Sequence, residues 1–134
     1  AGTFEGRNIH YLGLKPPEAL AAYAARFDVA LMPFAQTEAA RAINPVKTLE
    51  YLAAGCRVVP TPIPDVERFF SDVVEIHPAV EPFLDAVARL LDERGSEADA
   101  QARRRGLERA RSRSWGAMSD EMETHLAALD RRRS

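Results

Sequence analysis

Cysteine, lysine and tryptophan are scarce in this chain of 134 residues. The single cysteine, Cys56, cannot form a disulfide within the chain, and no group of cysteines and histidines has the spacing of a zinc site. The fold must therefore depend on the burial of apolar side chains. A reducing compartment, the cytoplasm, is the expected location.

Long apolar runs and a strong net charge are also absent. No run approaches the ~18 apolar residues that a membrane-spanning helix needs, and the first residues lack the pattern of a signal peptide. Their abrupt start resembles the edge of a fragment. The formal net charge of −2 gives no overall field that would gather nucleic acid or an anionic membrane. We therefore expect no nucleic-acid partner.

The chain does contain enough apolar sequence for a core, since 46% of its residues are hydrophobic. Apolar runs alternate with helical patterns, which is typical of a parallel sheet flanked by helices. Strands are expected at residues 8–13, 28–34, 57–60 and 73–77. Helices are expected at residues 16–26, 44–55, 66–70, 82–93, 97–113 and 115–131.

The predicted fold is α/β: a Rossmann-like parallel sheet of about four strands within one partial domain, residues 1–134. Residues 98–134 form its C-terminal helices. The first of these, arginine-rich from Arg103 to Arg113, has acidic neighbours and is expected to present a solvated face. The second is amphipathic, and its apolar stripe is expected to be buried; the stripe consists of Trp115, Met118, Met122, Leu126 and Leu129.

The segment from Asn44 to Gly55 carries most of the functional information. Asn44 can cap a helix, Pro45 suits the first helical position, and Gly55 can end the helix. The free N–H groups and the positive end of the helix dipole would then face a ligand near Asn44, Pro45 and Val46. A phosphate group is the natural ligand for such a helix start.

Charged residues within and before this helix strengthen the prediction. Lys47 lies in the first turn, where a lysine opposes the helix dipole, and this suggests a point charge for a phosphate. Glu50 lies nearly two turns into the helix, where a carboxylate could accept hydrogen bonds from the two hydroxyls of a ribose. Arg41, just before the helix, is a second candidate for binding the phosphate. It could equally be a solvated loop residue with no ligand.

The turn formed by Gly13, Leu14 and Lys15 follows the first predicted strand, where a nucleotide base could lie against the backbone; a plain turn explains it nearly as well. His10 and His77 have no Cys, Ser or Asp partner at a readable spacing, so we predict structural roles for them, and we expect His125 at the surface. We predict no catalytic residue and no metal site in this chain.

Together these residues resemble the C-terminal, donor-binding half of a retaining GT-B glycosyltransferase of group 1. Asn44 to Thr61 is similar to the family's "P-x-K-x-x-E-y-l-A-a-G-x-P-V-V-a-t" core, and residues 20–34 to its "L-x-x-x-y-x-x-a-D-v-x-l-x-P" unit. Asn8 to Gly13 resembles its "v-x-f-l-G" strand. Ser114-Trp115 resembles the "s-W" that opens its final helix.

The resemblance implies specific roles and specific gaps. Glu50 matches the glutamate that binds the ribose, whereas Ala42 stands where the family has a second glutamate for the transferred sugar. Arg57 replaces a common proline, which concerns packing. The family's first two strands, its glycine-rich loop, its diphosphate-binding Arg/Lys pair and its N-terminal acceptor domain are all missing. In the family's strand order 3-2-1-4-5-6, the two missing strands lie between the first predicted strand of this chain and the other three. The fragment would therefore have to close that gap by repacking or by pairing with another copy.

The resemblance implies a nucleoside-diphosphate sugar as the substrate, transferred to the hydroxyl of an unknown acceptor in polysaccharide or glycoconjugate synthesis. No cofactor or metal is expected, and the isolated chain is expected to be inactive. Peripheral attachment of the parent protein to a membrane stays open. Two alternatives also stay open: a nucleotide-sugar epimerase of the same fold, and a non-catalytic α/β binding or assembly module.

Overall fold

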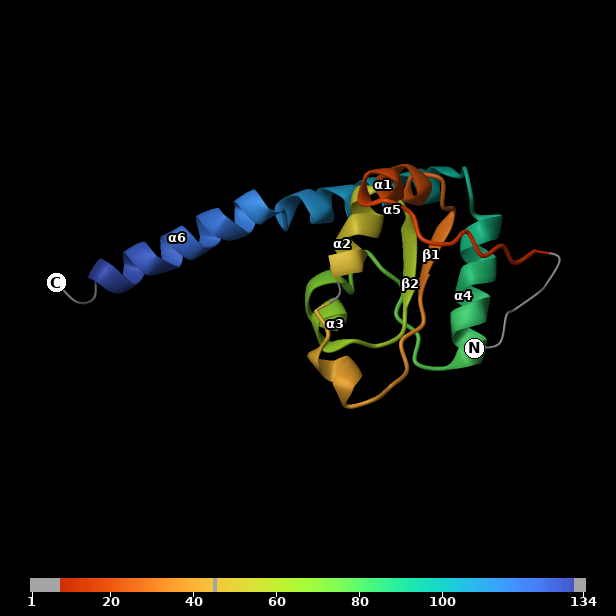
Figure 1. Cartoon of the computed structure of the whole chain (residues 1–134), viewed down its shortest axis with the longest axis horizontal. Coiled ribbons are helices and arrows are strands. Elements are labelled where there is room, and N and C mark those ends of the chain that lie inside the picture. Colours follow the sequence, from red (N-terminus) through yellow and green to blue (C-terminus); the bar gives the residue numbers. More distant parts are fainter. Residues whose placement is uncertain (1–7, 45, 132–134) are drawn as a thin grey trace.

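A computed structural model describes residues 8–44 and 46–131, including the side chains of residues 8–44 and 46–125. Two short strands lie between helices, and the last helix extends away from the rest of the molecule (Figure 1). In chain order the elements are α1 (Pro17–Ala24), β1 (Val29–Met32), the 3-10 helix η1 (Ala39–Ala42), α2 (Val46–Ala53), β2 (Arg57–Pro60), α3 (Pro64–Phe70), α4 (Val80–Asp92), α5 (Glu97–Ser112) and α6 (Trp115–Arg131).

The strands β1 and β2 are parallel neighbours, with Val29 opposite Arg57 and Met32 opposite Pro60. They are joined through α2, so the centre of the fold is a βαβ unit. Because β2 pairs with only one edge of β1, the other edge of β1 has no strand beside it within the described residues. The prediction of an α/β fold with a parallel sheet is confirmed.

The predicted number of about four strands was too high, since the described residues contain two. Residues 8–13 are exposed and form no strand. A strand needs a hydrogen-bonded neighbour, and the resemblance places the one neighbour of this segment, the family's second strand, outside the chain. Residues 73–77 form no regular strand, yet Glu75 and His77 donate their N–H groups to the carbonyls of Val58 and Pro60, both at 3.1 Å. This segment therefore lies along β2 but lacks the regular hydrogen-bond pattern that defines a strand.

The two faces of the sheet support separate apolar clusters, because successive side chains of a strand point to opposite faces. Val58 packs on one side with Leu52, Ile63, Val66 and Phe70, under α2 and α3. Val59 packs on the other side with residues of α4, namely Phe83, Ala86 and Leu90. Burial on both faces explains why β2 is continuously apolar after Arg57.

A partly buried ion cluster around the buried Asp99 connects α5 to the starts of both strands. The guanidinium of Arg103 donates to Asp99 at 2.9 Å, to the Gly55 carbonyl at 2.8 Å and to the Asp28 carbonyl at 3.1 Å. Arg57 contacts Asp99 at 3.4 Å and Glu75 at 3.1 Å. The expected solvated face is therefore wrong for Arg103, which stabilises the fold.

The exposure of α6 also differs from the prediction. Trp115 is 80% exposed, Met118 38% and Met122 62%, so the stripe is not buried against the rest of the chain. The side chains of Leu126 and Leu129 lie outside the described residues. An amphipathic pattern predicts that a helix has an apolar face, but it does not identify what covers that face. Among the described residues, no helix combines the length and apolar character required to span a bilayer.

Asp99 makes the stability of the fold depend on pH. Burial acts to raise the pKa of Asp99, but hydrogen bonds from Arg103 and Gly95, together with the Arg103 charge, hold it below its ordinary value of 3.8. Because the folded pKa is lowered, the contribution to stability is complete at neutral pH and is lost as the pH falls below about 4.

We predict that Asp99→Asn lowers the free energy of unfolding at pH 7 by about 2–3 kcal/mol, because it removes the carboxylate partner of Arg103 and one of the carboxylates that Arg57 contacts. Urea unfolding measured at pH 7 and below pH 4 tests this, and the difference between the proteins should shrink in acid. Asp92→Asn, an exposed change of the same kind on α4, is the control. Equal effects of the two substitutions would contradict the prediction.

Gly106 allows α5 to approach α2 closely. A Cβ atom at this position would lie 2.9 Å from Cδ2 of Leu52, and Leu52 is only 1% exposed, so it has little room to move. We predict that Gly106→Val lowers the free energy of unfolding by about 1–3 kcal/mol through overpacking. Ala100→Val, at an exposed position of the same helix, controls for helix propensity. Similar losses in urea unfolding would show that the close approach is unimportant.

Candidate functional site

The start of α2 lies at the carboxyl edge of the sheet, because α2 leads from the end of β1 back to the start of β2. Thr48 is fully buried, and its hydroxyl donates to the sulfur of Met32 at 3.6 Å. This contact holds the first turn of α2 against the end of β1. Open α/β sheets bind ligands at this edge.

The predicted residues at the helix start are partly described. Asn44 is exposed, and its carbonyl accepts a hydrogen bond from the N–H of Val46 at 3.0 Å. Val46 is 47% exposed. Pro45 lies outside the described residues. The predicted role of Asn44, Pro45 and Val46 in binding a phosphate stays a prediction.

Lys47 and Glu50 contact each other on the surface of α2. Nζ of Lys47 lies 2.5 Å from a carboxylate oxygen of Glu50, and the two side chains are 54% and 48% exposed. The hydrogen bond to Glu50 raises the pKa of Lys47, so its ammonium group is charged throughout the neutral range. A cation and a carboxylate are thus held together beside the sheet edge and remain open to solvent.

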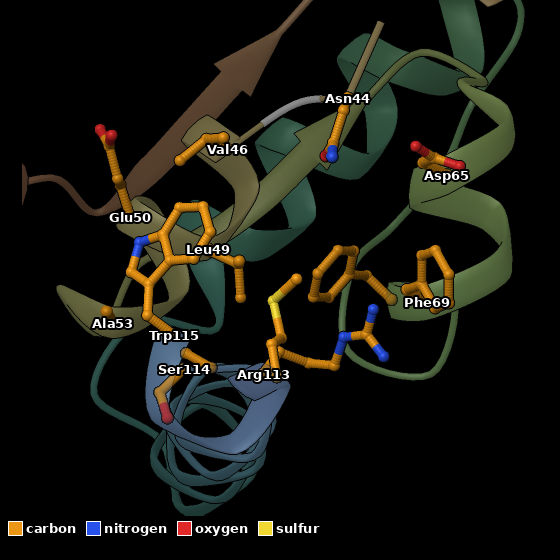
Figure 2. A pocket seen from close by; sticks show the side chains of 13 residues that line it. Asn44, Val46, Leu49, Glu50, Ala53, Asp65, Phe69, Arg113, Ser114 and Trp115 are labelled. Atoms are coloured by element: carbon orange, nitrogen blue, oxygen red, sulfur yellow. The ribbon is translucent and has the colours of Figure 1, made fainter. Parts of the chain in front are cut away.

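Two cavities flank α2. The larger, about 400 Å³, lies between α2, α3 and the α5–α6 junction; Figure 2 shows its lining. The smaller, about 210 Å³, is lined by Lys47 and Tyr51 of α2 and by Leu31, Met32 and neighbours of β1. Since Leu31 and Met32 point to opposite faces of the sheet, this cavity lies at the free edge of β1.

Other predicted residues are not brought to these cavities. Leu14 is 99% exposed, and Nζ of Lys15 lies 5.7 Å from the centre of the Tyr23 ring. Gly13, Leu14 and Lys15 line neither cavity. Arg41 is exposed on η1 and also lines neither cavity. Their roles in ligand binding remain predictions.

Some residues of the site were not predicted. Asp65 and Phe69, from α3, line the larger cavity, as do Arg113 and Trp115 from the α5–α6 junction. Asp65 could have been found, because it follows the proline turn after β2 at the carboxyl edge. The residues described by the structure contain no group of three or more His, Cys, Asp or Glu side chains placed to share a metal ion.

Comparison with known families identifies the chain. The model of a family described as "Glycosyl transferase-like" matches residues 1–122. The chain belongs to this glycosyl transferase-like family. The resemblance drawn from the Asn44 to Thr61 segment is thereby confirmed.

One curated relative of this family member comes from Bacillus subtilis (strain 168) and is named "Putative teichuronic acid biosynthesis glycosyltransferase TuaH". The two are 28% identical over 116 residues, which cover 83% of this chain and 28% of the relative. The chain therefore spans less than a third of that relative. No solved structure matches significantly.

The exposure of Trp115 can be tested directly, because the family member has a single tryptophan. We predict that acrylamide quenches its fluorescence almost as efficiently as that of the urea-unfolded chain, since the side chain is 80% exposed. Strong protection in the folded state would instead mean that the apolar stripe of α6 is covered, as the sequence pattern suggested.

Proposed function

We propose that the first two turns of α2 bind a nucleoside-diphosphate sugar, and that the parent protein transfers the sugar to a hydroxyl acceptor. The observation that carries this proposal is the pairing of Lys47 with Glu50, 2.5 Å apart and open to solvent beside the carboxyl edge of the sheet. Membership of the glycosyl transferase-like family supports the assignment. The relative's printed name supports a role in polysaccharide synthesis.

Each side chain of the pair suits a different part of the substrate. The ammonium of Lys47 would bind the diphosphate as a point charge, supported by the positive end of the α2 dipole. The carboxylate of Glu50 would accept hydrogen bonds from the two ribose hydroxyls. Both groups would then exchange their mutual contact for contacts with the substrate.

In the proposed reaction, the bond from the sugar C1 to the β-phosphate oxygen breaks, and a bond from C1 to the acceptor oxygen forms. The nucleoside diphosphate leaves with the bonding electron pair, and its departing phosphate oxygen takes up the proton that the acceptor hydroxyl loses. Lys47 would stabilise the negative charge that develops on the leaving diphosphate. The chain supplies one wall of such a site, so we propose that it does not complete turnover alone.

We predict that Glu50→Gln and Lys47→Gln each weaken binding of UDP or GDP by at least about tenfold, the effect of losing one charge-assisted hydrogen bond. Isothermal titration calorimetry should use a version of the protein extended to include the preceding part of its parent. Glu67→Gln, an exposed change on α3, is the matched control and should bind normally.

Two results together would overturn the proposed function. One is the absence of binding by both nucleotides to the extended protein. The other is unchanged sugar transfer by the full-length parent carrying Glu50→Ala. Product analysis would also separate transfer to an acceptor from epimerisation of the nucleotide sugar.

A further inference from the structure

The larger cavity has features that the proposed donor contacts do not use. Its walls are mainly apolar and come from Leu49 of α2, Phe69 and Phe70 of α3, Ala110 of α5 and Met118 of α6. Its volume of about 400 Å³ is within the range of small-molecule sites. Trp115 stands at its rim with 80% of its surface exposed, and tryptophan favours positions that are partly apolar and partly wet.

Two arginines lie over one aromatic ring of this cavity. The guanidinium carbon of Arg113 is 4.2 Å from the centre of the Phe69 ring, and that of Arg68 is 4.9 Å from it. No acidic partner of either arginine is found among the described residues. By contrast, the neighbouring Arg109 is paired with Asp72. Arg113 lines the cavity, whereas Arg68 lies over the same ring without lining it. One available positive charge, that of Arg113, therefore stands in the cavity wall.

The acidic side chains of the cavity lie apart from Arg113. In Figure 2, Asp65 and Glu50 lie on opposite sides of the view, the carboxylate of Glu50 points away from the other labelled residues, and Arg113 extends beneath Phe69. A ligand with one anionic group and a hydrocarbon part matches Arg113 and the apolar wall together.

We propose that this cavity binds a single amphiphile with a hydrocarbon chain and a phosphate group. The hydrocarbon chain packs against Leu49, Phe70 and Met118, and the phosphate lies at Arg113. A bilayer lying flat along α6 is a poorer match, because that helix carries Asp120, Glu121 and Glu123. The cavity includes Glu50 of the proposed donor site, but the proposed amphiphile contacts are at Arg113 and the apolar wall, so competition with a nucleotide distinguishes the two proposals.

Fluorescence of Trp115, the chain's single tryptophan, provides the measurement. The probe is dodecyl phosphate, titrated below its critical micelle concentration. We expect a saturable blue shift as the hydrocarbon covers the indole. Dodecyl maltoside, with the same hydrocarbon chain and a neutral head, should bind at least about tenfold more weakly, because it lacks the charge-assisted bonds. Inorganic phosphate should cause no shift.

Variants locate the phosphate. The substitution R113Q should weaken dodecyl phosphate binding by about tenfold or more and leave dodecyl maltoside binding unchanged. The matched control is R104Q, which removes the same charge from an exposed position of α5 and should bind normally. Circular dichroism checks that both variants fold.

Several outcomes would overturn the proposal. Equal affinity for the two detergents would show that Arg113 does not select a phosphate. Equal losses of dodecyl phosphate affinity in R113Q and R104Q would show that only the net charge of the protein matters. Displacement of dodecyl phosphate by UDP would assign the cavity to the nucleotide. Binding only to vesicles that contain phosphatidylglycerol would mean that a membrane surface, rather than a single amphiphile, is recognised.

Discussion

The contacts of Arg103 are the interaction on which the rest of the structure depends. One guanidinium group bonds to the backbone just before β1, to the backbone just before β2 and to a buried carboxylate of its own helix. These bonds hold the two strands in parallel at their amino ends. Because α2 connects these strands, fixing them also fixes the position of its first turn at the opposite edge. The proposed substrate-binding residues are thus positioned from the far end of the sheet.

The first turns of α2 combine rigidity with accessibility. On the buried side, Thr48 contacts Met32 and Leu52 packs closely against α5. On the solvent side, Lys47 and Glu50 remain about half exposed and form an ion pair with each other. A ligand-binding pair on a well-packed helix keeps its spacing while its side chains stay free to exchange partners. This arrangement suits a site that binds and releases a charged substrate.

Much of this organisation could be predicted from the sequence, because local patterns determine helices and fully buried strands. The bounds of β2 and α6 agree with their predicted ranges, and the spacing of Lys47 and Glu50 already allows a contact between neighbouring turns. Tertiary partners could not be predicted in the same way. Arg103 looks like Arg104 in the sequence, and only the packing of α5 shows that one is bound and the other exposed. Residues 8–13 have a strand pattern but no neighbour to pair with.

The free edge of β1 relates folding to function. The smaller cavity lies at this edge and includes Lys47, so a strand added beside Val29–Met32 would also form a wall next to the proposed phosphate-binding lysine. Extending the sheet and enclosing the ligand would then be a single event. The ligand would then stabilise the pairing of the added strand with β1, and this pairing would in turn complete the ligand site. Strand pairing and ligand binding would therefore be thermodynamically linked.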